Sequence, residues 1–201
     1  MICLKQLKES VYLPQKVAFT PNGALFFFRL KTLTFQFMDF SPIFTPIEKI
    51  GQLVFKSPRD LFPFINKELG VSDWTIITQE LIQQFANATG DHQWIHLDAE
   101  RCARESPFKK TIAHGMLTLS LLPQWINAIY TIENITLVVN YGFNRVRFIQ
   151  PVLSNSKLRM RCTLQNIELK NGAYTITHSC VVEMQNIEKP VCVAEWLSVV
   201  C

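Results

Sequence analysis

The sequence predicts an α+β fold in which a curved antiparallel sheet wraps around one buried helix. The first observation is a helix-length stretch from about Gly115 to Tyr130 that has no charged side chain and is apolar almost all the way round, so it must be enclosed. The second is the alternation of apolar and polar side chains over residues 158–164 and 174–184, which is typical of half-buried antiparallel strands. A sheet wrapped around the helix gives each of them an apolar partner.

The length of 201 residues favours one main domain. We place this domain at residues 38–201. Residues 1–37 are rich in Phe and lack a consistent period, and we expect them to form an N-terminal extension with no assigned function. Hydrophobic residues make up 48% of the chain and charged residues 18%, which excludes a wholly disordered protein.

The distribution of charge excludes two classes of partner. The formal net charge is +4, and the Lys and Arg residues are scattered rather than gathered in one stripe, so nucleic acid is not a predicted partner. The longest uncharged run, residues 116–132, is slightly short for a membrane span and contains Pro123. A buried helix is therefore expected there, and no membrane association.

The cysteines predict neither a metal site nor another cofactor. The six cysteines include no CxxC pair and no Cys/His spacing of the zinc-finger type. Cys162, Cys180 and Cys192 stand inside alternating apolar stretches, where a free thiol behaves as a small hydrophobe. This placement and the lack of a clear targeting signal favour a reducing compartment, the cytoplasm.

Prolines that interrupt regular structure and residues that cap helices define the first elements of the domain. Four prolines within residues 40–71 predict a wrapping loop with one helical turn near residues 58–61. Residues 74–77 are β-rich. Thr78 then offers an N-cap for a helix that runs to Thr89 and is stopped by Gly90.

A second short helix and the strands follow. Asp98 can cap a helix that runs through Glu105, after a loop over residues 90–97. Beyond the buried helix, residues 136–139 and 145–148 are β-type, Asn171-Gly172 supplies the turn between the two alternating strands, and residues 191–200 form the closing strand.

The loop between the two capped helices contains an acid and an imidazole. Asp91 and His96 lie five positions apart, with Trp94 and Ile95 between them to bury the loop. A carboxylate and an imidazole that reach one water form a general acid/base pair. The spacing fits equally a structural loop in which Asp91 caps backbone N–H groups and His96 is a satisfied, half-buried polar residue, which is the commoner use of such residues.

The start of the buried helix offers a hydrogen-bond donor for a carbonyl oxygen. Its first backbone N–H groups have no partner within the helix, and Gly115 has no side chain to block a ligand. The Gly115 N–H is therefore a candidate oxyanion donor. His114 is a weaker candidate for ligand contact, because a histidine at a helix start more often packs against the turn.

Three motifs resemble one family. GDHQWIHLD, TIAHGMLTLSLLP and VNYGFNRVRFIQPV stand in this order along the chain, and together they resemble the MaoC-like dehydratases of the R-specific enoyl-CoA hydratase type, in the nodulation-protein-N-like branch. The similarity covers residues 51–200. It implies a hotdog fold, reversible R-specific hydration of a trans-2-enoyl thioester, and a homodimer.

The resemblance also assigns site residues. The acid/base pair of the family falls on Asp91 and His96, and its oxyanion glycine falls on Gly115. Asn144, in the third motif, is a candidate substrate contact, although Asn and Gly residues there are also ordinary turn formers. Many hydratases have Asn-Pro where this chain has Gln93-Trp94, which leaves the acyl specificity open.

The sequence thus predicts a lyase without metal or redox cofactor whose substrate is an acyl-CoA or acyl-carrier thioester. Two alternatives remain at this point. A hotdog thioesterase uses the same scaffold and glycine turn but hydrolyses the thioester. A non-catalytic acyl-thioester-binding protein keeps the fold without turnover, although it has no need of an acid/base couple beside an oxyanion donor.

Overall fold

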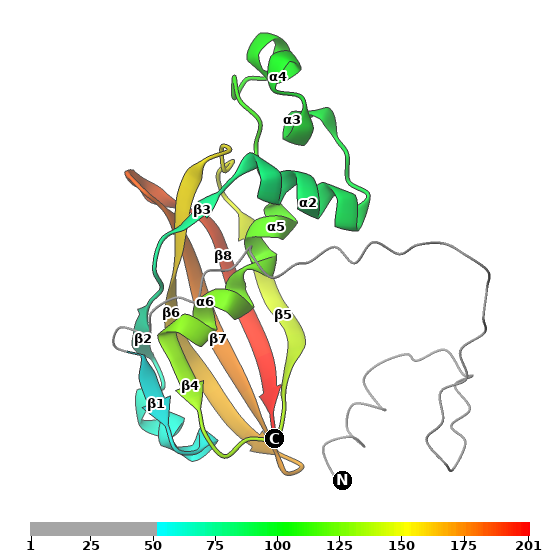
Figure 1. The fold of residues 1–201 in the computed structure, drawn as a ribbon. Coiled ribbons are helices and arrows are strands. Elements are labelled where there is room, and N and C mark those ends of the chain that lie inside the picture. Colours follow the sequence, from blue (N-terminus) through cyan, green and yellow to red (C-terminus); the bar gives the residue numbers. More distant parts are fainter. Residues whose placement is uncertain (1–51) are drawn as a thin grey trace, which may run out of the picture. The chain divides into compact units, whose positions relative to one another are not determined.

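A six-stranded antiparallel sheet curves around a pair of helices in the computed structural model, which describes residues 52–201 (Figure 1). The order of the strands is β2-β6-β7-β8-β5, and β3 also pairs with β6. Their bounds are Lys67–Val71 (β2), Thr75–Ile77 (β3), Val138–Phe148 (β5), Ser156–Lys170 (β6), Ala173–Met184 (β7) and Ile187–Val200 (β8). The predicted α+β architecture is confirmed. The predicted boundary at residues 37/38 lies outside the described residues.

The strands β6, β7 and β8 form the predicted meander. Leu158 pairs with Met184 at one end of the β6–β7 hairpin, and Lys170 pairs with Ala173 at the other. Asn171 and Gly172 connect them with φ values of 52° and 83°, and positive φ at both positions is the signature of a type I′ turn. The alternating side chains on one face of the three strands are buried in the core.

Two predictions about the strands were wrong. The segment predicted as a wrapping loop contains β2, which pairs with β6 across a register shift between Glu68 and Gly70. Five residues with a bulge are too few to show a period, so only the pairing with β6 reveals this strand. The two β-type stretches around residues 136–148 form one continuous strand, β5, which bulges between Asn140 and Gly142.

Two further strands form a separate two-stranded sheet. β1 (Leu53–Phe55) pairs in parallel with β4 (Tyr130–Ile132), and the 3-10 helix η1 (Pro58–Phe64) contains the predicted helical turn. Within residues 52–201, no helix is long and apolar enough to cross a membrane.

The predicted caps are confirmed in the segment before the central helices. Thr78 caps α2 (Gln79–Thr89) by accepting a hydrogen bond from Leu81 N at 3.2 Å, and Gly90 ends it at a φ of 78°. Asp98 caps α4 (Ala99–Glu105). The intervening loop was predicted to have no helix, but it contains one helical turn, α3 (Trp94–Leu97). These three helices stand at one end of the sheet (Figure 1).

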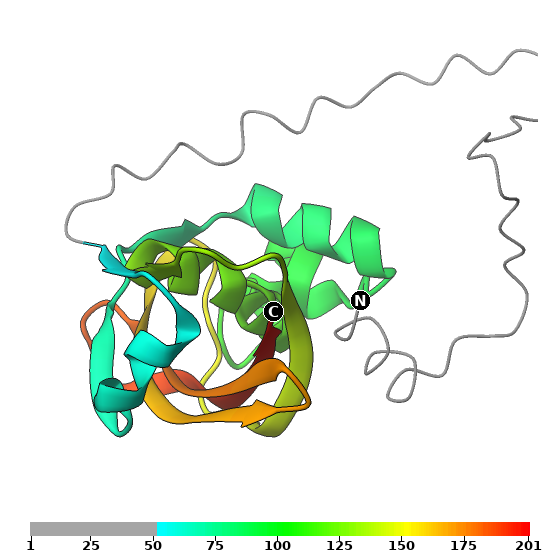
Figure 2. The same ribbon diagram turned by 90° about the horizontal axis from the view of Figure 1, so that it is seen from below.

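The central helix was predicted as one piece, but it is two. α5 (Gly115–Ser120) and α6 (Leu122–Ile129) meet at Leu121 and lie on the concave side of the sheet (Figure 2). In a continuous helix, Pro123 would have no N–H to donate to the carbonyl four residues earlier, and its ring would collide with that carbonyl. The helix therefore breaks just before Pro123. The prediction that this helix is enclosed on all sides was also wrong. Trp125 is fully buried, but the Met116 side chain is 58% exposed.

Candidate functional site

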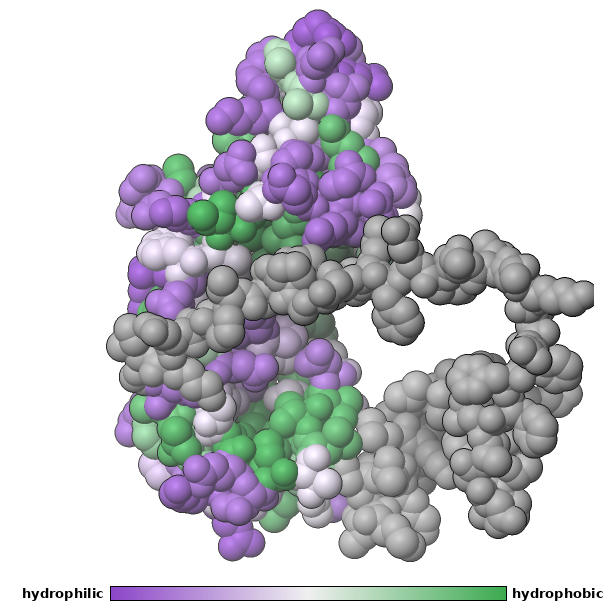
Figure 3. All heavy atoms as spheres, viewed as in Figure 1, coloured by the Kyte–Doolittle hydropathy of each residue, from purple (hydrophilic) through white to green (hydrophobic). Residues whose placement is uncertain are grey.

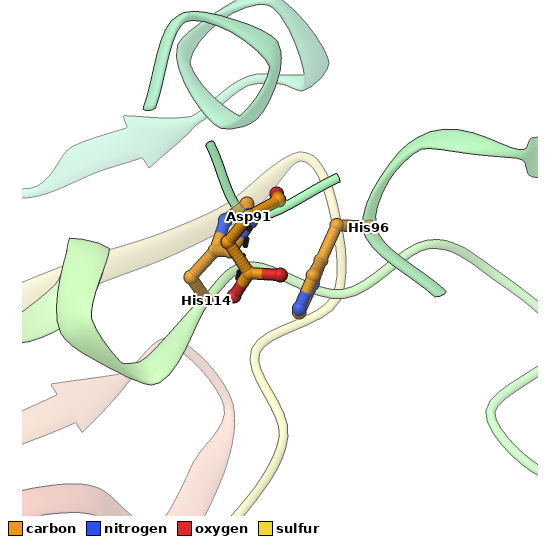
Figure 4. A group of neighbouring side chains, drawn as sticks. All are labelled: Asp91, His96 and His114. Carbon is orange, nitrogen blue, oxygen red and sulfur yellow. Dashed lines mark hydrogen bonds and ion pairs between the residues drawn. The ribbon is translucent and has the colours of Figure 1, made fainter. Parts of the chain in front are cut away.

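Three side chains from separate segments meet where the capped helices approach the central helix. Asp91 follows α2, His96 lies in α3, and His114 directly precedes α5 (Figure 4). One nitrogen or carboxylate oxygen from each lies within 4.8 Å of the others. His96 and His114 are 6% and 3% exposed, whereas Asp91 is open to solvent. The structure therefore brings together the predicted pair and adds His114.

Hydrogen bonds fix the backbone around His96 against the segment that leads to α5. Gln79 donates from Nε2 to the His96 carbonyl at 2.8 Å and accepts from the Thr111 hydroxyl at 2.6 Å. The backbone N–H of Ile112 donates to the Ile95 carbonyl at 3.0 Å. The acid/base loop is thus joined to the turn at Gly115 by a short chain of polar contacts.

The position of the proton on His96 follows from its partner. Nδ1 lies 2.7 Å from the carbonyl oxygen of Ile112, which can only accept, so Nδ1 carries the proton and Nε2 presents a lone pair. Burial lowers the pKa of His96 below its usual value of 6.5, although the Ile112 carbonyl opposes this shift; of two weaker effects, His114 lowers the pKa and Asp91 raises it. A neutral imidazole at pH 7 is ready to accept a proton.

The Asp91 carboxylate is poorly explained by capping. Its Oδ1 accepts a bond from Gln93 N at 3.4 Å, longer than a normal N–H···O bond. Its Oδ2 lies 4.0 Å from His114 Nε2. The α3 helix itself has no side-chain cap at Gln93. Of the two interpretations that the sequence left open, a carboxylate that faces the histidines agrees better with this geometry.

Gly115 and His96 line the same cavity, which has a volume of about 370 Å³. Its walls come from α3, the segment before α5, α5, the end of β5, the segment that follows β5, and β8: His96, Phe108, Ile112, Ala113, Gly115, Thr118, Phe148, Ile149, Gln150, Pro151, Val152 and Val191. A Cβ atom on Gly115 would lie 3.0 Å from the ring of Phe148. This position therefore has no room for a side chain while Phe148 stays in place.

Asn144 is not brought into this group. It is exposed on β5, at the register shift between Phe143 and Arg145, and it does not line the cavity. Its role as a substrate contact stays a prediction. Phe148, by contrast, lies against Gly115 and was not singled out from the sequence. No local signal marks it, since its alternation is that of any strand residue.

Among the described residues, Asp91, His96 and His114 form the group that is suited by composition to hold a metal ion. The two imidazole rings, however, are stacked, with their centroids 3.7 Å apart and their planes at 28°. In-plane lone pairs of stacked rings run side by side and do not converge on one ion. A carboxylate next to a neutral imidazole is instead the combination that general acid/base chemistry uses.

Comparison with known proteins finds a matching family and close relatives. Residues 62–185 match the family model described as the MaoC like domain. The chain is 48% identical over 142 residues to 3-hydroxyacyl-thioester dehydratase Z of Mycobacterium tuberculosis (strain ATCC 25618 / H37Rv), which covers 70% of this chain and 93% of the relative. It is 41% identical over 145 residues to Nodulation protein N of Rhizobium meliloti (strain 1021), covering 71% and 90%.

The fold has solved relatives as well. The unliganded R-hydratase PhaJ1 from Pseudomonas aeruginosa superposes with a TM-score of 0.56 at 25% sequence identity, covering 67% of this chain and 79% of that chain. The curved sheet with its central helix is therefore the hotdog fold, as predicted.

Proposed function

Since this chain belongs to the MaoC-like dehydratase family, in its nodulation-protein-N-like branch, we propose that it adds water reversibly to trans-2-enoyl thioesters to give R-3-hydroxyacyl thioesters. The family contains hydratases and dehydratases, and the relatives above include a 3-hydroxyacyl-thioester dehydratase and an R-hydratase. The observation that carries the proposal is that His96 and Gly115 line one cavity, with Asp91 beside His96.

The chemistry follows from three groups. The Gly115 N–H, in the first turn of α5, donates to the thioester carbonyl oxygen and stabilises the negative charge that develops there as an enolate forms. Asp91 and His96 hold one water. As its oxygen bonds to C3, the pair takes a proton from the water and a proton is returned to C2. We assign both proton transfers to the pair and neither of them to one residue alone.

We propose that coenzyme A carries the acyl group of the substrate. Substrates on an acyl carrier protein are tested in parallel in the assay below. The formal charge of +4 favours the approach of the phosphates of either carrier. We also propose that the protein acts in the cytoplasm. Among the described residues, Cys102, Cys162, Cys180 and Cys192 are buried free thiols, which suits a reducing compartment.

A homodimer is the assembly that we propose. Within the described sheet, β5 is an edge strand, and edge strands offer unpaired backbone groups to a second chain. Val138 and Tyr141 on this strand are 53% and 51% exposed. Apolar side chains also gather on the surface beside the start of β5 (Figure 3). Sedimentation of the purified protein tests this proposal, and a monomer at micromolar concentration contradicts it.

One assay separates the proposed reaction from its alternatives. Short, medium and branched enoyl-CoAs are incubated with the protein, and the enoyl absorbance and the free thiol are followed together, with enoyl-acyl carrier proteins in a parallel series. Hydration lowers the absorbance without releasing thiol. Thiol release would make the protein a thioesterase, and tight binding without any change in absorbance would make it a binding protein.

A further inference from the structure

His114 contacts both halves of the proposed site. Its ring lies between the ring of His96, 3.7 Å away, and that of Phe85, 5.1 Å away. Its Nε2 lies 3.0 Å from the backbone carbonyl oxygen of Asp91. A carbonyl oxygen only accepts, so Nε2 carries the proton and donates it to this bond. The next residue along the chain is Gly115, the proposed oxyanion donor.

The loop that carries Asp91 has few other anchors. Among the described residues, the remaining hydrogen bonds of residues 90–93 join groups at most five positions apart. Gly90 N donates to the Ala86 carbonyl at 2.8 Å, His92 N donates to the Gly90 carbonyl at 3.1 Å, and the others are equally local. Such bonds shape residues 90–93 but do not fix the distance of Asp91 from α5. The contacts through Gln79 and Ile112 hold residues 95 and 96, and the bond from His114 is the one that holds residues 90–93.

An imidazole at position 114 costs the folded protein some stability. With Nε2 protonated, Nδ1 of His114 is a buried acceptor that has no hydrogen-bond partner within residues 52–201. An unpaired buried polar atom costs about 1–3 kcal/mol. Phenylalanine would fill the same space between two rings without this cost. The donor on Nε2 is therefore the property that explains a histidine here.

We infer that His114 is a positioning residue, which holds the Asp91 loop against the Gly115 turn so that the acid/base pair and the oxyanion donor meet one substrate. This inference rests on the proposed hydration of enoyl thioesters. It assigns His114 no proton transfer of its own.

Two substitutions separate the donor from the ring. In His114→Phe the ring remains between His96 and Phe85 but the donor is lost. In His114→Gln the side-chain amide offers an N–H at a similar distance from the backbone. We expect kcat for crotonyl-CoA to fall about 10²-fold in the Phe variant, the effect of a misplacement of about 1 Å, with KM changed less than about threefold. We expect the Gln variant to stay within about tenfold of the wild type.

The control is His92→Ala, which removes an exposed histidine of the same loop and is expected to leave kcat unchanged. A Phe variant with wild-type kcat overturns the inference. So does a Gln variant that is as slow as the Phe variant, because the hydrogen bond would then not be the cause.

A second measurement needs neither turnover nor a folded variant. Nitrogen-15 NMR of the wild-type protein reports which ring nitrogen of His114 is protonated, and we expect Nε2. Protonation at Nδ1 alone overturns the inference, whatever the activity. If the wild-type protein hydrates no enoyl thioester, the proposed function fails instead, and the state of His114 is still read from this spectrum.

Discussion

Two buried histidine clusters lie against different stretches of β8, and only one of them has the partners that proton transfer needs. His96 borders the cavity that includes Val191, and a carboxylate stands beside it. His178 borders a second cavity of about 150 Å³ that includes Val200. Its Nε2 is 2.8 Å from the hydroxyl of Tyr130. Both imidazoles are buried, so the difference lies in what each one faces.

The two clusters differ in the group that lies beside each histidine. Burial lowers the pKa of His178 to about 4, although the Trp196 backbone opposes this shift, and burial raises the pKa of Tyr130 far above its usual value. Neither group changes its protonation near pH 7, and their hydrogen bond is buried. At His96 a carboxylate can share a proton. We therefore keep the proposed acid/base role for His96, which has both a carboxylate and a cavity beside it.

Substitution at each cluster should affect a different property, and the effect at the site is the largest that we predict. Asp91→Asn and His96→Ala are expected to lower kcat for crotonyl-CoA about 10³-fold, while circular dichroism shows an intact fold. His178→Gln keeps a partner for the Tyr130 hydroxyl and should retain wild-type kcat. Near wild-type turnover in either site variant would remove the proposed acid/base role.

Acid should destabilise the protein through His178. Its pKa is about 4 in the folded protein and 6.5 in an unfolded reference, so the unfolded chain binds more protons as the pH falls below 6.5, and stability is lost down to about pH 4. At about 1.4 kcal/mol for each pH unit, this amounts to about 3 kcal/mol. Urea unfolding at pH 7 and pH 4 should show a smaller loss for His178→Gln than for the wild type. Equal losses would contradict the assignment.

A methyl group at the helix start should reduce substrate entry. In Gly115→Ala the new Cβ meets the ring of Phe148 at 3.0 Å and occupies the approach to the backbone N–H. Because Phe148 is partly exposed and can move, we expect kcat/KM to fall only about tenfold. Steady-state kinetics on crotonyl-CoA measure this, and an unchanged kcat/KM would place the oxyanion donor elsewhere.

The smallest predicted effect is on the pH profile. Because burial lowers the pKa of His96 below 6.5, its neutral form persists to lower pH than in a free histidine. We expect kcat/KM to fall as His96 becomes protonated, with the midpoint of the decline below pH 6.5. A decline that is centred above pH 6.5 would show a group other than His96 in control.

The sequence predicted the helices α2 and α4 well, because capping residues mark where they begin or end. Thr78, Gly90 and Asp98 act through bonds to residues three or four positions away, so the sequence was sufficient. The strand β2 depends on its pairing with the distant strand β6, which local residues do not reveal. The break at Leu121 had a local signal in Pro123, which was not used to divide the predicted helix.

The site shows the same division. The pair Asp91 and His96 was visible as a spacing within one loop, and Gly115 was visible as a glycine at a helix start. His114 was ranked below Gly115, because a histidine at a helix start more often packs against the turn. Its contact with the Asp91 carbonyl spans 23 positions and leaves no pattern in the sequence.

Transfer of the oxygen of water tests the central claim most directly. Crotonyl-CoA is incubated with the wild-type protein in water enriched in oxygen-18, and the products are analysed by mass spectrometry. We predict an intact 3-hydroxyacyl thioester with one labelled oxygen on C3. A label in a free carboxylate, or a substrate that is recovered unchanged, would contradict the claim that this site hydrates the double bond of an enoyl thioester.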